Sequence, residues 1–168
     1  MSVGVIRSLL PHLHRGAEQV SSAIYGTVSA LAVIVVAGHE EAAVGRVLTF
    51  AAVSTVIVWG IHVYASVLSD ICTAGTAWRD AIPRGFRDEL GVIEGAAAPL
   101  LVLALGVLGL LDPDRVVWWS VMTGVGLLTV MPLFWLRRSG EPWGRCLAAS
   151  AVACSFGLAL VVLKVLAH

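Results

Sequence analysis

The sequence predicts an all-α polytopic membrane protein, a bundle of five transmembrane helices joined by short loops. The first observation is composition: 58% of the 168 residues are hydrophobic and only 13% are charged, whereas a soluble domain carries about 25% charged residues. The second is a mean hydropathy of +0.91. The third is a recurrence of apolar stretches of about 20 residues, the length that crosses a hydrocarbon core. We expect one transmembrane domain over residues 1–168 because little of the chain is left over.

Each apolar stretch is long enough for one membrane crossing. Inside a bilayer every backbone polar group needs a partner within the protein. Five strands could not close into a barrel, so we expect helices. The predicted spans are Val20–Ala37, Val47–Leu68, Val92–Leu111, Val116–Leu136 and Cys146–Ala167.

The segment between the second and third spans, Ser69–Leu90, is too polar to cross the membrane. Large apolar residues recur there at every fourth position, interleaved with arginines, which predicts an interfacial helix lying along the membrane surface. These apolar residues are Trp78, Ile82, Phe86 and Leu90. A basic edge that only maintains orientation is the simpler interpretation of the arginines. Pro83 is placed to begin the helix that becomes the third span, because proline is tolerated in a first helical turn.

The basic residues predict the orientation. With a cytoplasmic N-terminus the inner segments contain Arg7, Arg15, Arg79, Arg84, Arg87, Arg137, Arg138 and Arg145, and the outer ones contain Arg46, Arg115 and Lys164. The excess of positive charge inside favours an N-terminus in the cytoplasm and a C-terminus outside.

Composition and motifs argue against several classes of function. Lys+Arg and Asp+Glu balance to a formal net charge of +0, so no basic field attracts nucleic acid. The cysteines Cys72, Cys146 and Cys154 show neither disulfide nor zinc-ligand spacing. The sequence contains no P-loop, GxSxG or HExxH motif. We therefore expect a protein without enzymatic activity, cofactor or bound metal, whose first partner is the lipid bilayer.

Polar residues of the second span form a stripe with helical spacing. The stripe consists of Thr55, Trp59, His62, Ser66, Ser69 and Asp70. His62 is about six residues from the predicted inner end of the span, which is roughly 9 Å at 1.5 Å per residue. An imidazole at that depth needs a polar partner. Tyr25, Ser29 and Glu94 are the candidates on neighbouring spans.

Glu94 is the most consequential of these candidates. It lies about one turn inside the third span, at the level of His62 and Tyr25 in the same half of the membrane. A Glu–His pair can relay a proton or bind a cation, and the alternative is an interhelical hydrogen bond that only fixes packing. The predicted pathway residues are His62, Glu94, Tyr25, Ser66 and Asp70.

The sequence thus favours an ion or proton channel or transporter, assembled as a homo-oligomer because so small a bundle has little interior of its own. A small cation or a proton would be the transported species. The alternative is a membrane scaffold or accessory subunit whose polar residues only pack helices. A membrane enzyme is a third class, and it would require a substrate pocket that no motif indicates.

Three segments carry a resemblance. They are Ser22-Ala23-Ile24-Tyr25-Gly26-Thr27, Trp59-Gly60-Ile61-His62-Val63-Tyr64-Ala65 and Leu163-Lys164-Val165-Leu166-Ala167-His168. With these segments the chain resembles small five-span integral membrane proteins of actinobacteria, whose function is uncharacterised. The resemblance implies a location in a bacterial plasma membrane and no particular activity.

Overall fold

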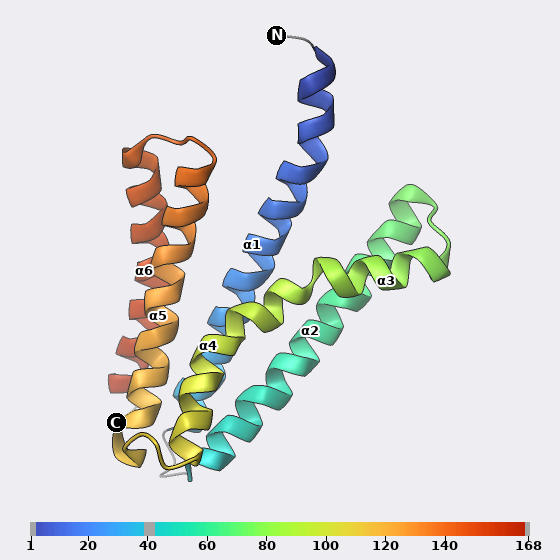
Figure 1. Ribbon diagram of the computed structural model, residues 1–168. Coiled ribbons are helices and arrows are strands. Elements are labelled where there is room, and N and C mark those ends of the chain that lie inside the picture. The colour runs from blue at the N-terminus through green and yellow to red at the C-terminus, as the bar shows by residue number, and fades with distance from the viewer. Residues whose placement is uncertain (1–2, 39–42, 167–168) are drawn as a thin grey trace.

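The described part of the chain is a bundle of α-helices (Figure 1). A computed structural model describes the backbone of residues 3–38 and 43–166, and the side chains of residues 20–38, 43–162 and 165. The described ranges contain no strand. In order the helices are α1 (Val3–Ala37), α2 (Val44–Ala74), α3 (Trp78–Asp88), α4 (Leu90–Val107), α5 (Pro113–Arg138) and α6 (Trp143–Leu166). Within the described residues, five helical segments are long and apolar enough to cross a membrane, which confirms an all-α, multi-pass membrane protein.

Local chemistry explains where the described helices begin and end. The α5 helix begins at Pro113, and the carboxylate of the preceding Asp112 accepts a hydrogen bond from the Asp114 N–H at 3.1 Å, as expected of an N-terminal cap followed by proline. The α2 helix continues to Ala74, beyond the predicted end at Leu68. It ends there because Gly75 adopts a left-handed conformation, with φ of 63°, that favours glycine.

The prediction of a separate interfacial helix between the second and third spans is wrong. Only Glu89 separates α3 from α4, and residues Trp78–Val107 form one nearly continuous helical segment. The inner face of α3 is made by the small residues Ala81 and Gly85. Small residues allow two helix backbones to approach closely, so this segment packs on α2 of the same chain instead of lying apart from the bundle.

The prediction that Pro83 begins the third helical segment is also wrong. The helix begins at Trp78, and Pro83 lies inside α3. The apolar residues Trp78, Ile82 and Phe86 are exposed on the surface of the described chain. The sequence periodicity therefore identified the exposed apolar face of this helix but not the element to which the helix belongs.

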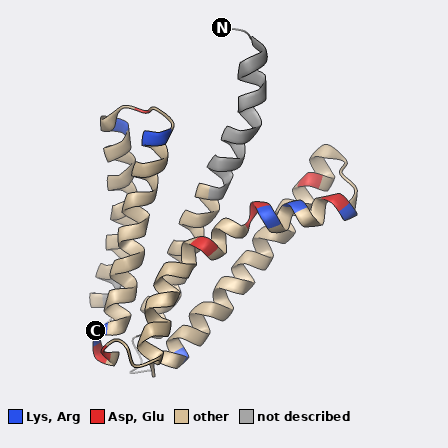
Figure 2. Cartoon of the chain, in the orientation of Figure 1, with Lys and Arg blue, Asp and Glu red and all other residues tan. Residues whose placement is uncertain are grey.

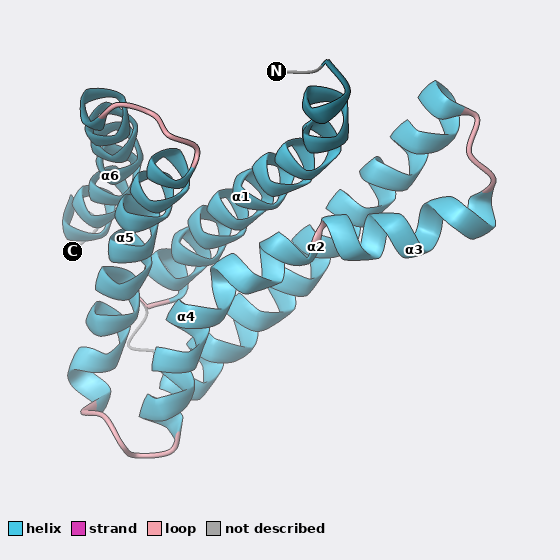
Figure 3. Cartoon of the chain, turned by 45° about the horizontal axis from the view of Figure 1, so that its top comes forward, coloured by secondary structure: helices cyan, strands magenta, loops and turns pink. Residues whose placement is uncertain are grey.

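The α1 helix is the centre of the bundle. It contacts every other helix. The α5–α6 hairpin packs on one side of it, and α2 with the α3–α4 segment packs on the other (Figure 1). The described connections are short and lie at the ends of the helices (Figure 3), so the spans run alternately in opposite directions.

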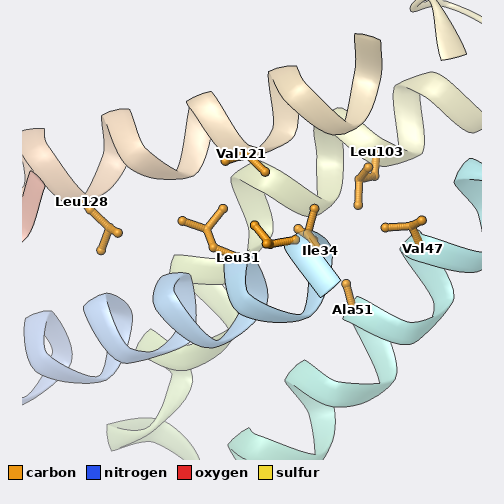
Figure 4. Close-up of a cluster of buried hydrophobic side chains, with 8 residues drawn as sticks. Leu31, Ile34, Val47, Ala51, Leu103, Val121 and Leu128 are labelled. Carbon is orange, nitrogen blue, oxygen red and sulfur yellow. The ribbon is translucent and has the colours of Figure 1, made fainter. Parts of the chain in front are cut away.

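A cluster of buried apolar side chains lies beside α1. Figure 4 shows side chains from α1, α2, α4 and α5 that meet between these helices. Leu31, Ile34 and Leu103 are each 0% exposed. The other buried members of this cluster are Val35, Val47, Ala51, Val121 and Leu128. The half of the bundle toward the α1–α2 and α4–α5 connections is therefore filled mainly by hydrocarbon side chains, with the buried Ser120 hydroxyl donating to the Pro99 carbonyl oxygen at 2.8 Å.

The α1 and α4 helices cross at very short range. A Cβ atom added at Gly95 would lie 2.0 Å from the Ala23 carbonyl oxygen, and one added at Gly26 would lie 2.1 Å from the Val92 carbonyl oxygen. Only glycine allows backbones to approach so closely. The crossing therefore fixes which face of α4 turns toward α1.

The charged residues of the described chain lie mainly at the two ends of the bundle (Figure 2). Arginines gather at the end with the α2–α3 and α5–α6 connections, on α3 and at Arg137, Arg138 and Arg145. Below, this end is called the basic end. The opposite end contains Arg46 and Arg115 beside Asp112 and Asp114.

Candidate functional site

The candidate site is built around Glu89, the single residue between α3 and α4. Its backbone departs from ideal helix, with φ of −94° and ψ of 6°, a combination found at turns and at many functional residues. The carboxylate turns toward α1, where Ser22 Oγ donates a hydrogen bond to Glu89 Oε2 at 2.8 Å. The Glu89 side chain is 17% exposed. Glu89 thus joins the start of α4 to the first turn of the apolar part of α1.

His62 of α2 completes the contact. Its Nδ1 atom lies 3.5 Å from Glu89 Oε2. This distance is within ion-pair range but longer than a usual N–H···O hydrogen bond, which is about 2.7–3.2 Å. The Tyr25 ring packs on the imidazole, with centroids 4.7 Å apart and planes tilted by 54°. The same carboxylate oxygen therefore faces a hydroxyl from α1 and an imidazole from α2.

These groups border a small polar pocket of about 250 Å³. It is lined by Ser21, Ser22, Tyr25, His62 and Glu89. The His62 side chain is 30% exposed, so the pocket is partly open to the surface. Its size suits a few water molecules or a hydrated small cation, since one water occupies about 30 Å³ of liquid.

The pocket lies at the basic end of the apolar spans. The apolar window of α1 begins at Val20 and α4 begins at Leu90, so Ser22 and Glu89 are both at the first turn of helices that run in the same direction. His62 reaches this level from α2, which runs in the opposite direction. Beyond the pocket, toward the opposite end, the neighbouring α1 positions Leu31 and Ile34 belong to the apolar core.

A second buried polar contact lies between the pocket and that core. Thr27 is 0% exposed. Its hydroxyl lies 2.8 Å from the Ala23 carbonyl oxygen and 2.9 Å from the Gly95 carbonyl oxygen. In a regular helix the Gly95 carbonyl would accept from the N–H of residue 99, but Pro99 has none. Thr27 therefore satisfies a backbone acceptor that proline leaves open.

The structure brings together two of the predicted pathway residues, His62 and Tyr25. Glu94 is exposed and is not within ion-pair distance of His62. The buried residues of α4 lie on the other side of that helix, where Gly91, Val92 and Gly95 face α1. The interhelical carboxylate of His62 is thus Glu89, not Glu94.

Ser66 and Asp70 lie farther along α2, toward its end at the basic end of the bundle. Both are half-buried, but neither lines the polar pocket. On the predicted stripe Thr55 is 5% exposed, and its hydroxyl donates to the Ala51 carbonyl oxygen at 2.8 Å. In this stripe the buried Thr55 hydroxyl thus bonds within its own helix, and His62 borders the pocket. The other hydroxyl and carboxylate groups lie near the end of α2.

Sequence reasoning missed Glu89 and Ser22. Glu89 was assigned to a polar surface segment because acidic and basic residues surround it. The available signal was its position next to the first residue of an apolar helix, where a carboxylate can reach back to neighbouring helices. The crossing of α1 and α4 decides that it does so.

The described residues contain no group of three or more His, Cys, Asp and Glu side chains close enough to hold one metal ion. The pocket instead offers one carboxylate, one imidazole and hydroxyl groups. A carboxylate and an imidazole can exchange protons, and histidine is the side chain whose charge changes most readily near neutral pH. The chemistry available is therefore binding and release of a proton or a small cation.

Comparisons with models of protein families, with curated proteins and with solved structures give no significant match. They therefore add no support to the resemblance to actinobacterial proteins. Composition and architecture supply the classification instead. The five apolar helices of spanning length in the described part of the chain make this a small multi-pass helical membrane protein.

Proposed function

We propose that this protein moves protons or small cations across a membrane, with Glu89 and His62 as its binding site. The observation that carries the proposal is the convergence of a carboxylate and an imidazole from different helices, 3.5 Å apart, on a partly open pocket at the edge of apolar spans. Ionisable groups in such positions are costly to maintain and often mark transport pathways.

The packed core supports a carrier rather than an open channel. Between the pocket and the opposite end, α1, α2, α4 and α5 are joined by buried apolar side chains such as Leu31, Ile34 and Leu103. A binding site accessible from one side and closed on the other fits one state of an alternating-access cycle. Movement of the ion would require a second arrangement of α1 against its neighbours.

Each pocket residue has a role in this proposal. Glu89 accepts the proton or cation, and His62 is its partner across the pocket. Ser22 orients the carboxylate through its hydrogen bond, while Tyr25 packs on the imidazole. Ser66 and Asp70 lie along the approach on α2 at the basic end. Glu89 takes the position that the sequence predicted for Glu94.

We also propose a bacterial plasma membrane with the basic end in the cytoplasm, supported by the excess of arginines there. A homo-oligomer is part of the proposal because so small a bundle has little interior of its own. Association could form a route between copies.

The experiment is a proton-flux assay in liposomes that contain a trapped pH-sensitive dye and the purified protein. Glu89→Gln and His62→Ala should each reduce flux at least tenfold, because each removes an ionisable group from the binding site. Glu94→Gln is the matched control and should retain wild-type flux, because Glu94 is exposed and outside the pocket. Absence of proton or cation flux in the wild type, or equal flux in all variants, would contradict the proposal.

A membrane scaffold or accessory subunit is the second candidate, and the continuous apolar core favours it. In that case the Ser22–Glu89 hydrogen bond only fixes the α3–α4 junction against α1. His62→Ala would then lower thermal stability in detergent and leave flux at the level of empty liposomes. Co-purification of a stoichiometric partner would support this candidate.

A further inference from the structure

A second surface feature lies where α1 packs against α5 and α6, whereas the polar pocket lies where α1 meets α2 and the α3–α4 junction. It is an open groove of about 490 Å³ between α1, α5 and α6. Its α1 and α5 walls are Ile24, Val28, Leu128 and Pro132. Its α6 wall consists of Ala148, Ala149, Val152, Ala153 and Phe156. The lining is almost wholly apolar, so a hydrocarbon group is the occupant that it suits.

The lining residues from α1, α5 and α6 all lie in one half of the bundle. Ile24 and Val28 lie in the early part of the α1 span, Leu128 and Pro132 in the late part of α5, and the α6 residues follow soon after Trp143. The groove thus opens in the half that adjoins the basic end. Along α6 it extends from Ala148 to Phe156, or about 12 Å at 1.5 Å per residue. One leaflet of a hydrocarbon core is about 15 Å thick.

Arginine side chains lie near the end of the groove at the basic end of the bundle. Arg145 shares a helical face with the α6 wall, because Ala149, Val152 and Phe156 follow it at intervals that keep one side of a helix. Arg145 is 75% exposed, and its Nη1 atom lies 3.0 Å from Glu141 Oε2. Arg137 and Arg138 end α5 at the same level. Around the α5–α6 connection, three arginines thus stand against one glutamate, Glu141.

We propose that the groove between α1, α5 and α6 binds an anionic phospholipid, with one acyl chain along Ala149, Val152 and Phe156 and the phosphate at Arg145. An exposed ion pair such as Arg145–Glu141 contributes little to stability, so Arg145 can exchange its contact for a lipid phosphate. Basic residues near a membrane surface each add on the order of 1 kcal/mol to the binding of anionic lipid. The proposal does not depend on the transport function.

The test is native mass spectrometry of the full-length protein released from mixed micelles. The lipids are palmitoyl-oleoyl phosphatidylglycerol and the phosphatidylcholine with the same chains. Arg145→Gln should weaken retention of phosphatidylglycerol about fivefold, the effect of one basic residue, and leave phosphatidylcholine unchanged. Arg115→Gln is the matched control. Arg115 is also 75% exposed and paired with a carboxylate, Asp112, but it lies at the opposite end.

A second pair of variants tests the acyl-chain contact. Ala149→Leu adds side-chain volume inside the groove and should reduce retention of both lipids. Ala151→Leu makes the same change on α6 at an exposed position outside the lining and should have no effect. Equal phosphatidylglycerol retention in all four variants would overturn the proposal. It would also be overturned if the wild type were a dimer that only Ala149→Leu converts to monomer, because the groove would then hold a second copy.

Discussion

Thr27 shows how one side chain can compensate for another at the scale of single residues. Pro99 removes the N–H that the Gly95 carbonyl would otherwise accept, and the Thr27 hydroxyl lies 2.9 Å from that oxygen. The whole arrangement is buried. A buried carbonyl without a donor costs about 1–3 kcal/mol, so Thr27 allows proline in the middle of α4.

This compensation predicts a coupling between Thr27 and Pro99. Thr27→Val should lower the free energy of unfolding by about 1–3 kcal/mol, because it leaves the Gly95 carbonyl without a donor. In a Pro99→Ala background the alanine N–H can supply that bond, so the same change should cost less. A double-mutant cycle from unfolding in mixed micelles measures the difference. Additive effects of the two substitutions would show that the hydroxyl does not serve the carbonyl opposite proline.

Ser22 is the second residue with a specific task. Its hydroxyl donates to Glu89 at 2.8 Å, and the serine is 8% exposed. Ser22→Ala should lower the free energy of unfolding by about 1–3 kcal/mol, the cost of leaving a charged or polar partner unsatisfied. The adjacent Ser21 lines the same pocket but is exposed, so Ser21→Ala should change stability little. Thermal unfolding in detergent compares the two, and equal melting temperatures would contradict the assigned role of Ser22.

At the scale of helices, glycine decides how α1 and α4 meet. The backbone of each helix occupies the space that a side chain of the other would need. Van der Waals packing of this kind is a main source of helix association in lipid, where water provides no driving force. The α1–α4 contact therefore positions both Thr27 and the α3–α4 junction that contains Glu89.

The close crossing of α1 and α4 predicts that a single added methyl group destabilises the protein. Gly26→Ala should lower the free energy of unfolding by at least about 1–3 kcal/mol, the usual cost of overpacking, since the new Cβ atom would lie 2.1 Å from a carbonyl oxygen. Gly60→Ala introduces the same methyl group in α2, where nothing lies within 4 Å. It should be neutral or stabilise by up to about 1 kcal/mol. Melting temperatures in detergent give the comparison, and a tolerated Gly26→Ala would place the two helices farther apart.

At the scale of the whole molecule, the basic end contains both the polar pocket and the mouth of the apolar groove. The pocket lies between α1, α2 and the α3–α4 junction, and the groove lies between α1, α5 and α6. A filled core separates the pocket from the opposite end. The molecule is thus asymmetric along the direction in which its helices run. Its orientation in the membrane decides which compartment the pocket faces.

A native cysteine reports that orientation. Cys72 is exposed near the end of α2, whereas Cys146 is buried and Cys154 is half-buried. With the basic end in the cytoplasm, a membrane-impermeant maleimide should label inside-out vesicles and leave right-side-out vesicles unlabelled. Cys72→Ser should abolish the signal. Labelling of right-side-out vesicles through Cys72 would reverse the proposed orientation.

The sequence alone was sufficient for the class of protein and for most helix positions. Bilayer thickness imposes a minimum apolar length, and this constraint is visible in any hydropathy profile. His62 and Tyr25 were predicted as neighbours because opposite helix directions place them at one level. Helical spacing in α3 correctly identified an apolar face with Trp78 and Phe86, but it carried no information on what the other face contacts.

Tertiary packing alone decided which carboxylate meets the histidine and whether α3 lies apart from the bundle. Glu89 and Glu94 are close in sequence, yet the rotation of α4 against α1 turns only Glu89 inward, and that rotation follows from backbone approach at Gly26 and Gly95. The packing of α3 on α2 depends in the same way on Ala81 and Gly85. Hydropathy gives the amount of apolar surface in a segment. Which face of a helix packs inward depends on the shapes of the neighbouring helices, and these become neighbours only when the chain has folded.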